Sequence, residues 1–176
     1  MSKLWVGWCI FILWVTGTSW LLFQTGNAYY GEFDPERQLQ QQLQQLPQLN
    51  RLIEPQNGAA TLLHVLDENC PCTQQALAHI QSLQGRFAQQ ALQQPLLQLY
   101  LSAAELRAAG VTVPATPMVI YLKDQQLHYS GPYASGPACS SSEDLLAAIV
   151  QNKMQTPDSW LNSETLSCRC LSQNTG

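Results

Sequence analysis

The pattern of apolar and polar positions divides the chain into one unbroken apolar run and a longer part where short apolar stretches alternate with polar ones. Residues 4–23 contain no charged side chain and are dominated by Trp, Ile, Leu, Val and Phe. A helix of about 20 residues spans about 30 Å, the thickness of the hydrocarbon core of a bilayer. The pattern predicts one transmembrane helix, within an anchor that we assign to residues 1–28.

The charges that flank this run predict its orientation. Lys3 and the amino terminus precede it, whereas Glu32 and Asp34 follow it. The positive-inside rule then leaves the N-terminus in the cytoplasm and carries the rest of the chain across the membrane. The alternative is a cleaved signal peptide that ends near residues 26–28. We favour a retained anchor because the apolar run is longer than the usual core of about 7–15 residues.

Residues 29–58 form a linker and a glutamine-rich segment. Leucines recur there at spacings of three and four, which predicts an amphipathic helix over residues 34–53. Asp34 is the expected N-cap and Pro35 the first helical residue, while Pro47 should bend or interrupt the helix. We expect the apolar face to pack on the domain or on a partner.

Residues 59–176 carry the alternation of a mixed α/β domain. Strands are predicted at 60–66, 96–101, 118–123 and 127–130, and helices at 72–90, 103–109 and 142–152. An alternating start followed by a hairpin and a last helix indicates a mixed sheet flanked by helices.

Composition excludes several classes of function. The chain has 176 residues and a net charge of −4, with no basic stripe, so nucleic acid is not an expected partner. We find no phosphate loop, nucleophile elbow or dinucleotide fingerprint, so nothing in the sequence supports a hydrolase, a kinase or a nicotinamide enzyme. We expect no cofactor and no bound metal.

Cysteine is the residue type that carries chemistry here. Cys9 lies in the apolar run and is expected to be inert. Cys70-Pro71-Cys72 falls where a predicted strand ends and a helix begins. Backbone N–H groups at a helix N-terminus stabilise a thiolate, so Cys70 is the candidate nucleophile and Cys72 the candidate resolving thiol. The alternative is a fixed disulfide or two passive thiols.

From these features the sequence resembles the thioredoxin superfamily over roughly residues 60–152. The resemblance rests on the strand before Cys70, on Thr116-Pro117 opening another strand, and on the last hairpin with Gly131. It implies a thioredoxin-like fold after the transmembrane helix. It also implies that Pro117 is a cis-proline that faces the cysteines and, with Thr116, helps to bind substrate backbone.

The part of the chain after the anchor also resembles a bacterial family of membrane-anchored thioredoxin-like proteins. The shared segments are Asp67 to Cys72, Gly131 to Gly136 followed by Cys139, Trp160 to Asn162, and Cys168-Arg169-Cys170. This resemblance implies a single-pass protein of the inner (cell) membrane, held through residues 4–23, with its C-terminal domain in the periplasm.

The cysteine motif departs from that of thioredoxin, because one residue rather than two separates its cysteines. Positions i and i+2 do not share a helix face, so Cys70 and Cys72 bond only if Cys70 precedes the helix. The small ring would be strained and easily reduced, which favours an oxidising or isomerising role. Alternatively, the pair never closes and Cys70 exchanges with a distant cysteine.

Two further groups of residues are candidates. Thioredoxins carry a buried acid at the position of His64, so the imidazole is a candidate proton shuttle; the alternative is a core histidine with its hydrogen bonds satisfied. For the tail we favour a structural disulfide from Cys139 to Cys168 or Cys170. The alternative is a relay in which the tail pair exchanges electrons with Cys70 and Cys72.

The leading hypothesis is a thiol–disulfide oxidoreductase or isomerase that acts on protein thiols or disulfides outside the cytoplasm, together with a membrane redox partner. A second hypothesis is a module that binds Cu(I) or zinc through thiolates. A third is a non-catalytic interaction protein on a thioredoxin-like scaffold.

Overall fold

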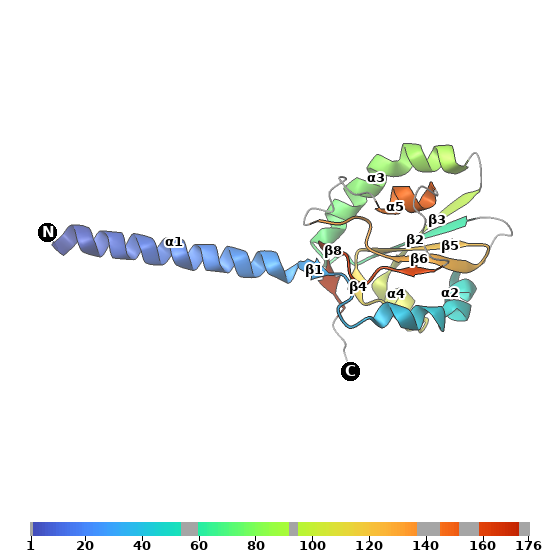
Figure 1. The fold of residues 1–176 in the computed structure, drawn as a ribbon, viewed down its shortest axis with the longest axis horizontal. Helices are drawn as coiled ribbons and strands as arrows, with labels where there is room; N and C mark the ends of the chain where they lie inside the picture. Colours follow the sequence, from blue (N-terminus) through green and yellow to red (C-terminus); the bar gives the residue numbers. More distant parts are fainter. Residues whose placement is uncertain (1, 54–59, 92–94, 137–144, 152–158, 173–176) are drawn as a thin grey trace.

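The computed structural model describes residues 2–53, 60–91, 95–136, 145–151 and 159–172 (Figure 1). A long N-terminal helix, α1 (Ser2–Ala28), extends away from the rest of the described chain. Its segment Trp5–Gly26 is long and apolar enough to cross a membrane, and none of it is buried. The prediction of an N-terminal helix that is long and apolar enough to cross a membrane is therefore confirmed.

A five-stranded mixed sheet forms the centre of the domain. Its strands are β2 (Ala60–Leu66), β3 (Leu96–Ser102), β5 (Met118–Lys123), β6 (Gln126–Gly131) and β7 (Trp160–Leu161). The order across the sheet is β3-β2-β5-β6-β7. β2 runs parallel to β3 and antiparallel to β5, β5 and β6 form a hairpin, and β7 is parallel to β6. The predicted mixed sheet is confirmed, and β7 extends it.

Helices cover both faces of this sheet (Figure 1). α3 (Cys72–Ala91) and α5 (Leu145–Val150) lie on one face, while α2 (Leu46–Ile53) and α4 (Ala103–Ala108) lie on the other. All three helices predicted after residue 59 are present. For the last one only Leu145–Val150 can be assessed, because residues 137–144 and 152–158 lie outside the described part.

The strand period divides the core into two clusters. Leu62 and Val119 face α3 and α5, whereas Leu63 and Ile120 face the opposite cluster, which includes Leu106 of α4. Successive side chains of a strand point to opposite faces of the sheet, so one buried strand supplies both clusters. The end of β2 and the start of α3 are thereby held between two packed layers.

The helix predicted over residues 34–53 is wrong in extent. A 3-10 helix, η1 (Gln38–Leu43), comes first and α2 follows, with Pro47 in the first turn of α2. Arg37 precedes η1 in a left-handed conformation (φ 55°), which an α-helix starting at Pro35 does not permit. The N-cap of η1 is Arg37 and not Asp34, but the Asp34 carboxylate still accepts the backbone N–H groups of Gln38 and Leu39 at 2.9 and 2.8 Å. The expected packing on the domain is confirmed by fully buried leucines at 39 and 49.

Two small sheets hold the tail, and neither was predicted. β1 (Tyr30–Glu32), which follows α1, pairs antiparallel with β8 (Leu166–Cys168), and Tyr30 lies opposite Cys168. β4 (Ala115–Thr116) pairs antiparallel with β9 (Cys170–Leu171), and Thr116 lies opposite Cys170. The tail therefore runs from the end of the apolar helix to the residues that precede Pro117.

Candidate functional site

Cys70 and Cys72 occupy the junction between β2 and α3. The backbone N–H of Cys70 donates to the carbonyl oxygen of Asp67 at 3.0 Å, and the Thr73 hydroxyl donates to the same oxygen at 2.6 Å. This turn leaves Cys70 before the helix, and Cys72 is the first helical residue. The predicted position of the motif is confirmed.

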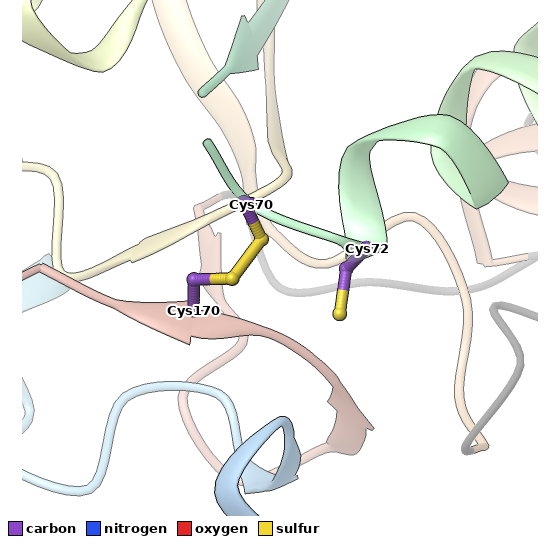
Figure 2. A group of neighbouring side chains, drawn as sticks. All are labelled: Cys70, Cys72 and Cys170. Atoms are coloured by element: carbon purple, nitrogen blue, oxygen red, sulfur yellow. A yellow bond between two sulfur atoms is a disulfide. The ribbon is translucent and has the colours of Figure 1, made fainter. Parts of the chain in front are cut away.

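Both cysteines form disulfides with the tail. Cys70 bonds Cys170 at 2.08 Å, and Cys72 bonds Cys168 at 2.03 Å. Figure 2 shows Cys70 joined to Cys170, with Cys72 beside them at the start of α3. A bond between Cys70 and Cys72 is absent from this arrangement, which agrees with the alternative in which Cys70 pairs with a distant cysteine.

The structural disulfide that we favoured from Cys139 to the tail is not compatible with these two bonds. Both tail sulfurs are already bonded to the Cys-Pro-Cys motif. Cys139 itself lies outside the described residues. The predicted bridge to the tail fails because of the path that the tail follows. β8 and β9 bring Cys168 and Cys170 directly against the β2–α3 junction.

The one-residue spacing in both motifs explains why the bonds form side by side. In an extended chain, residues i and i+2 point to the same side. Cys168 and Cys170 belong to extended segments on either side of Arg169, so both sulfurs can face the junction. The spacing that disfavours a bond within one motif thus suits two bonds between the motifs.

The four cysteines differ in their access to solvent. Cys70, Cys72 and Cys168 are buried, with exposed fractions of 3%, 1% and 7%, whereas Cys170 is partly exposed. The sulfurs of Cys70, Cys72 and Cys170 lie within 4.8 Å of one another. Of the four bonded cysteines, Cys170 is the most exposed residue, and any exchange there occurs next to the sulfurs of Cys70 and Cys72.

Backbone carbonyl oxygens surround the cluster. The Cys70 sulfur lies 3.5 Å from the carbonyl oxygen of Thr116, and the Cys72 sulfur lies 3.9 Å from that of Tyr29. The Thr116–Pro117 peptide bond is cis. The structure thus brings Thr116 beside Cys70, although these residues are far apart in the sequence.

His64 sits in a stack of rings rather than against a sulfur in the contacts described. Its Nδ1 lies 2.9 Å from the Tyr133 hydroxyl, and its ring stacks on Tyr100 and Tyr133. Burial lowers the pKa of His64 to about 4, against a smaller opposing effect of the hydrogen bond to Gln98, so the imidazole is neutral at pH 7. These contacts suit a core histidine with satisfied hydrogen bonds, and the proton-shuttle role stays a prediction.

Arg169 and Tyr29 are site residues that the sequence analysis missed. The backbone N–H of Arg169 donates to the carbonyl oxygen of Tyr29 at 2.7 Å, and its Nε donates to that of Glu32. Burial lowers the pKa of the Arg169 guanidinium, and the Glu32 carboxylate opposes this effect. The matching spacing of the two cysteine pairs was the available signal, because it indicates that the segment around Arg169 faces the Cys-Pro-Cys motif.

The cluster lies close to the end of the apolar helix along the chain. The segment able to span a membrane ends at Gly26, three residues before Tyr29. At about 3.8 Å between consecutive Cα atoms, the stretch from Gly26 to Tyr29, which includes the end of α1, spans no more than about 11 Å. If α1 crosses a membrane, the disulfides are therefore near its surface.

Comparison with known proteins gives a family for this chain. Residues 36–172 match the model of a family described as "Domain of unknown function (DUF6436)". Neither the comparison with curated proteins nor that with solved structures found a match.

Proposed function

Since the chain belongs to the DUF6436 family through residues that include all four bonded cysteines, we propose that it acts through them as a membrane-anchored, extracytoplasmic thiol–disulfide oxidoreductase. The observation that carries the proposal is the pair of disulfides between the Cys-Pro-Cys motif and the tail. Two adjacent disulfides can accept four electrons, twice the capacity of one. A purely structural staple would need only one of them.

The exchange begins at Cys170. A thiolate of a substrate dithiol attacks the partly exposed Cys170 sulfur, forms a mixed disulfide and releases Cys70 as a thiolate. The peptide dipoles at the N-terminus of the 20-residue helix α3 favour that leaving group. The second substrate thiol then attacks the substrate sulfur of the mixed disulfide and releases Cys170 as a thiolate. The substrate has lost two electrons and two protons, and the Cys70–Cys170 pair has gained them.

The second disulfide extends this step to a relay, the alternative raised from the sequence. The thiolate of Cys170 lies within 4.8 Å of the Cys72 sulfur. Its attack forms a Cys72–Cys170 bond and releases Cys168, so the bond moves without any change in the number of electrons. A second dithiol then reduces this bond, and the cluster holds four thiols.

The resemblance to the thioredoxin superfamily supports a substrate groove at Thr116 and Pro117. β9 pairs with β4 there, and Cys170 lies opposite Thr116 while bonded to Cys70. We propose that an extended segment of a substrate protein replaces β9 when the bond opens. The strand order β3-β2-β5-β6, with its parallel and antiparallel pairings, is compatible with a thioredoxin-like fold.

The location of the cluster supports a partner in the membrane. Two residues separate Gly26 from Tyr29, whose carbonyl oxygen lies beside Cys72. We propose that protein thiols on the periplasmic side supply electrons and that a redox partner within the inner membrane reoxidises the cluster. The short linker would keep the disulfides at the membrane surface, where such a partner is accessible.

A redox titration of the full chain in detergent tests this proposal. The protein is equilibrated with buffers of defined thiol–disulfide potential, and free thiols are trapped with a mass tag. We expect Cys70, Cys72, Cys168 and Cys170 to change state between roughly −270 and −120 mV, the range from thioredoxin to strong oxidants. Bonds that stay closed, or thiols that stay free, across this range would overturn the proposal. C9S and C139S variants define the background labelling.

A further inference from the structure

We propose that the fully reduced cluster is a zinc site in which Cys70, Cys72, Cys168 and Cys170 bind one Zn²⁺ as four thiolates. The inference uses the cysteines of the proposed function, but it requires only that both disulfides can be opened. It adds a second state to the cluster, in which a metal ion replaces the two disulfides.

Three of the four sulfurs already lie together as the ligands of a metal site would. Those of Cys70, Cys72 and Cys170 lie within 4.8 Å of one another, whereas Cys168 stands outside this group and is linked to it by its bond to Cys72 at 2.03 Å. Zinc–sulfur bonds of about 2.3 Å put the sulfurs of a tetrahedral site about 3.8 Å apart. Each bonded pair has to separate by about 1.7 Å to reach that spacing, and the Cys168 sulfur has to turn toward the other three, which rotation of its side chain allows once the bond is open.

The surroundings favour a cation over bare thiolates. Carbonyl oxygens of Thr116 and Tyr29 lie 3.5 and 3.9 Å from the sulfurs of Cys70 and Cys72, and they would repel thiolate charge in a buried site. Zn²⁺ neutralises two of the four negative charges. The N-terminus of α3 offsets part of the remainder.

The choice of zinc follows from the number and type of ligands. Four thiolates without an open position are typical of structural zinc sites. The balance is complete: two molecules of a dithiol reductant convert both disulfides to four thiols, and Zn²⁺ then displaces four protons. The bound metal would hold the tail against the β2–α3 junction after reduction and would protect the thiolates from reoxidation.

Cobalt titration of the reduced full chain in detergent tests the site. The protein is reduced with a phosphine, kept free of oxygen and titrated with Co²⁺ as the probe. We expect one Co²⁺ per chain, with the sulfur-to-cobalt charge-transfer bands and intense visible bands of a tetrahedral tetrathiolate, and displacement by equimolar Zn²⁺. The oxidised protein should bind no cobalt in this mode.

Variants connect the signal to the named cysteines. C168S combined with C170S should abolish the tetrathiolate spectrum, and C168S alone should shift it to that of a three-sulfur site. C9S and C139S should leave the spectrum unchanged. Circular dichroism of each reduced variant checks that the domain remains folded. A spectrum that survives C168S with C170S, a weak octahedral spectrum or no binding would overturn the inference, as would selective uptake of Cu(I) with only two or three thiolates.

The outcomes separate this inference from the proposed function. If the four cysteines titrate with dithiol buffers but bind no Co²⁺, the zinc site is wrong and the oxidoreductase proposal stands. If reduction by the phosphine yields a tetrathiolate cobalt site while the disulfides do not respond between roughly −270 and −120 mV, the zinc site stands and the oxidoreductase proposal is wrong.

Discussion

At the scale of single residues, Gly131 ends β6 where a side chain has no room. A Cβ there would lie 2.8 Å from the Asn162 Cβ and 2.9 Å from the Tyr129 hydroxyl oxygen, both in buried residues. We expect G131A to lower the free energy of unfolding by about 1–3 kcal/mol through overpacking. Chemical denaturation of the full chain measures this.

Gly85 provides the matched control. It is exposed within α3, and a Cβ there would meet nothing within 4 Å. Because glycine is unfavourable inside a helix, G85A should raise the free energy of unfolding by about 0.5–1 kcal/mol. Equal effects of the two substitutions would contradict the packing described around Gly131.

His64 gives the domain a specific dependence on pH. Burial lowers its pKa in the folded state from 6.5 to about 4, so the unfolded state binds the proton at a higher pH. The contribution of neutral His64 to the free energy of unfolding is therefore fully present above about pH 6.5. It is lost as the pH falls toward 4, and it amounts to roughly 3 kcal/mol in total.

A comparison of variants isolates this contribution. The free energy of unfolding of H64F should depend less on pH between 6.5 and 4 than that of the unaltered chain. H128Q, which changes a half-buried histidine on β6, should keep the original slope. Identical slopes for H64F and the unaltered protein would show that His64 titrates normally.

At the scale of elements, the two disulfides are nested. Cys72–Cys168 lies inside the loop closed by Cys70–Cys170, and their sequence separations are 96 and 100. In the chain-entropy account, a loop of about 100 residues is worth about 4.7 kcal/mol, and a loop of a few residues only about 2. Either bond alone therefore constrains nearly the whole loop.

This nesting predicts strongly non-additive losses. C70A with C170A, or C72A with C168A, should each lower the free energy of unfolding by about 2 kcal/mol, whereas all four substitutions should lower it by roughly 5 kcal/mol or more. Chemical denaturation under oxidising conditions measures the free energy of unfolding of the three variants. Simple addition of the two smaller losses would contradict the nested connectivity.

The elements that could be predicted are those with a clear hydrophobic period. β2 and β5 are mostly apolar and almost wholly buried, and α3 carries an apolar stripe of Ala76, Ile80, Leu83 and Phe87, all buried. The strands β1, β4, β7, β8 and β9 have two or three residues each, too few to show a period. Their pairing depends on contacts between distant segments, which local pattern does not encode.

The same distinction applies to the candidate site. The position of Cys70 and Cys72 followed from local signals, a strand end and a helix start. Their partners depended on the course of the tail, set by β1–β8 and β4–β9 pairing, so the favoured bridge to Cys139 was wrong for both tail cysteines. Pro47 was recognised as an interruption, but the left-handed Arg37 that delays η1 had no signal in the pattern.

At the scale of the whole molecule, the proposed location has a direct test. An impermeant maleimide applied to reduced cells with a permeabilised outer membrane should label Cys170, the partly exposed cysteine of the cluster. A C170S variant is the matched control. Labelling that requires rupture of the inner membrane would place the domain in the cytoplasm and contradict the orientation predicted from Lys3 and Glu32.

The central claim is that two disulfides join the Cys-Pro-Cys motif to the tail and open in sequence from Cys170. Its most direct test is a disulfide map of the full chain after graded reduction by a dithiol and rapid alkylation. The account predicts Cys70–Cys170 and Cys72–Cys168 in the oxidised protein, with Cys70–Cys170 the first to open because Cys170 alone is partly exposed. A Cys70–Cys72 bond in the oxidised protein, or a Cys139 bond to either tail cysteine, would contradict it.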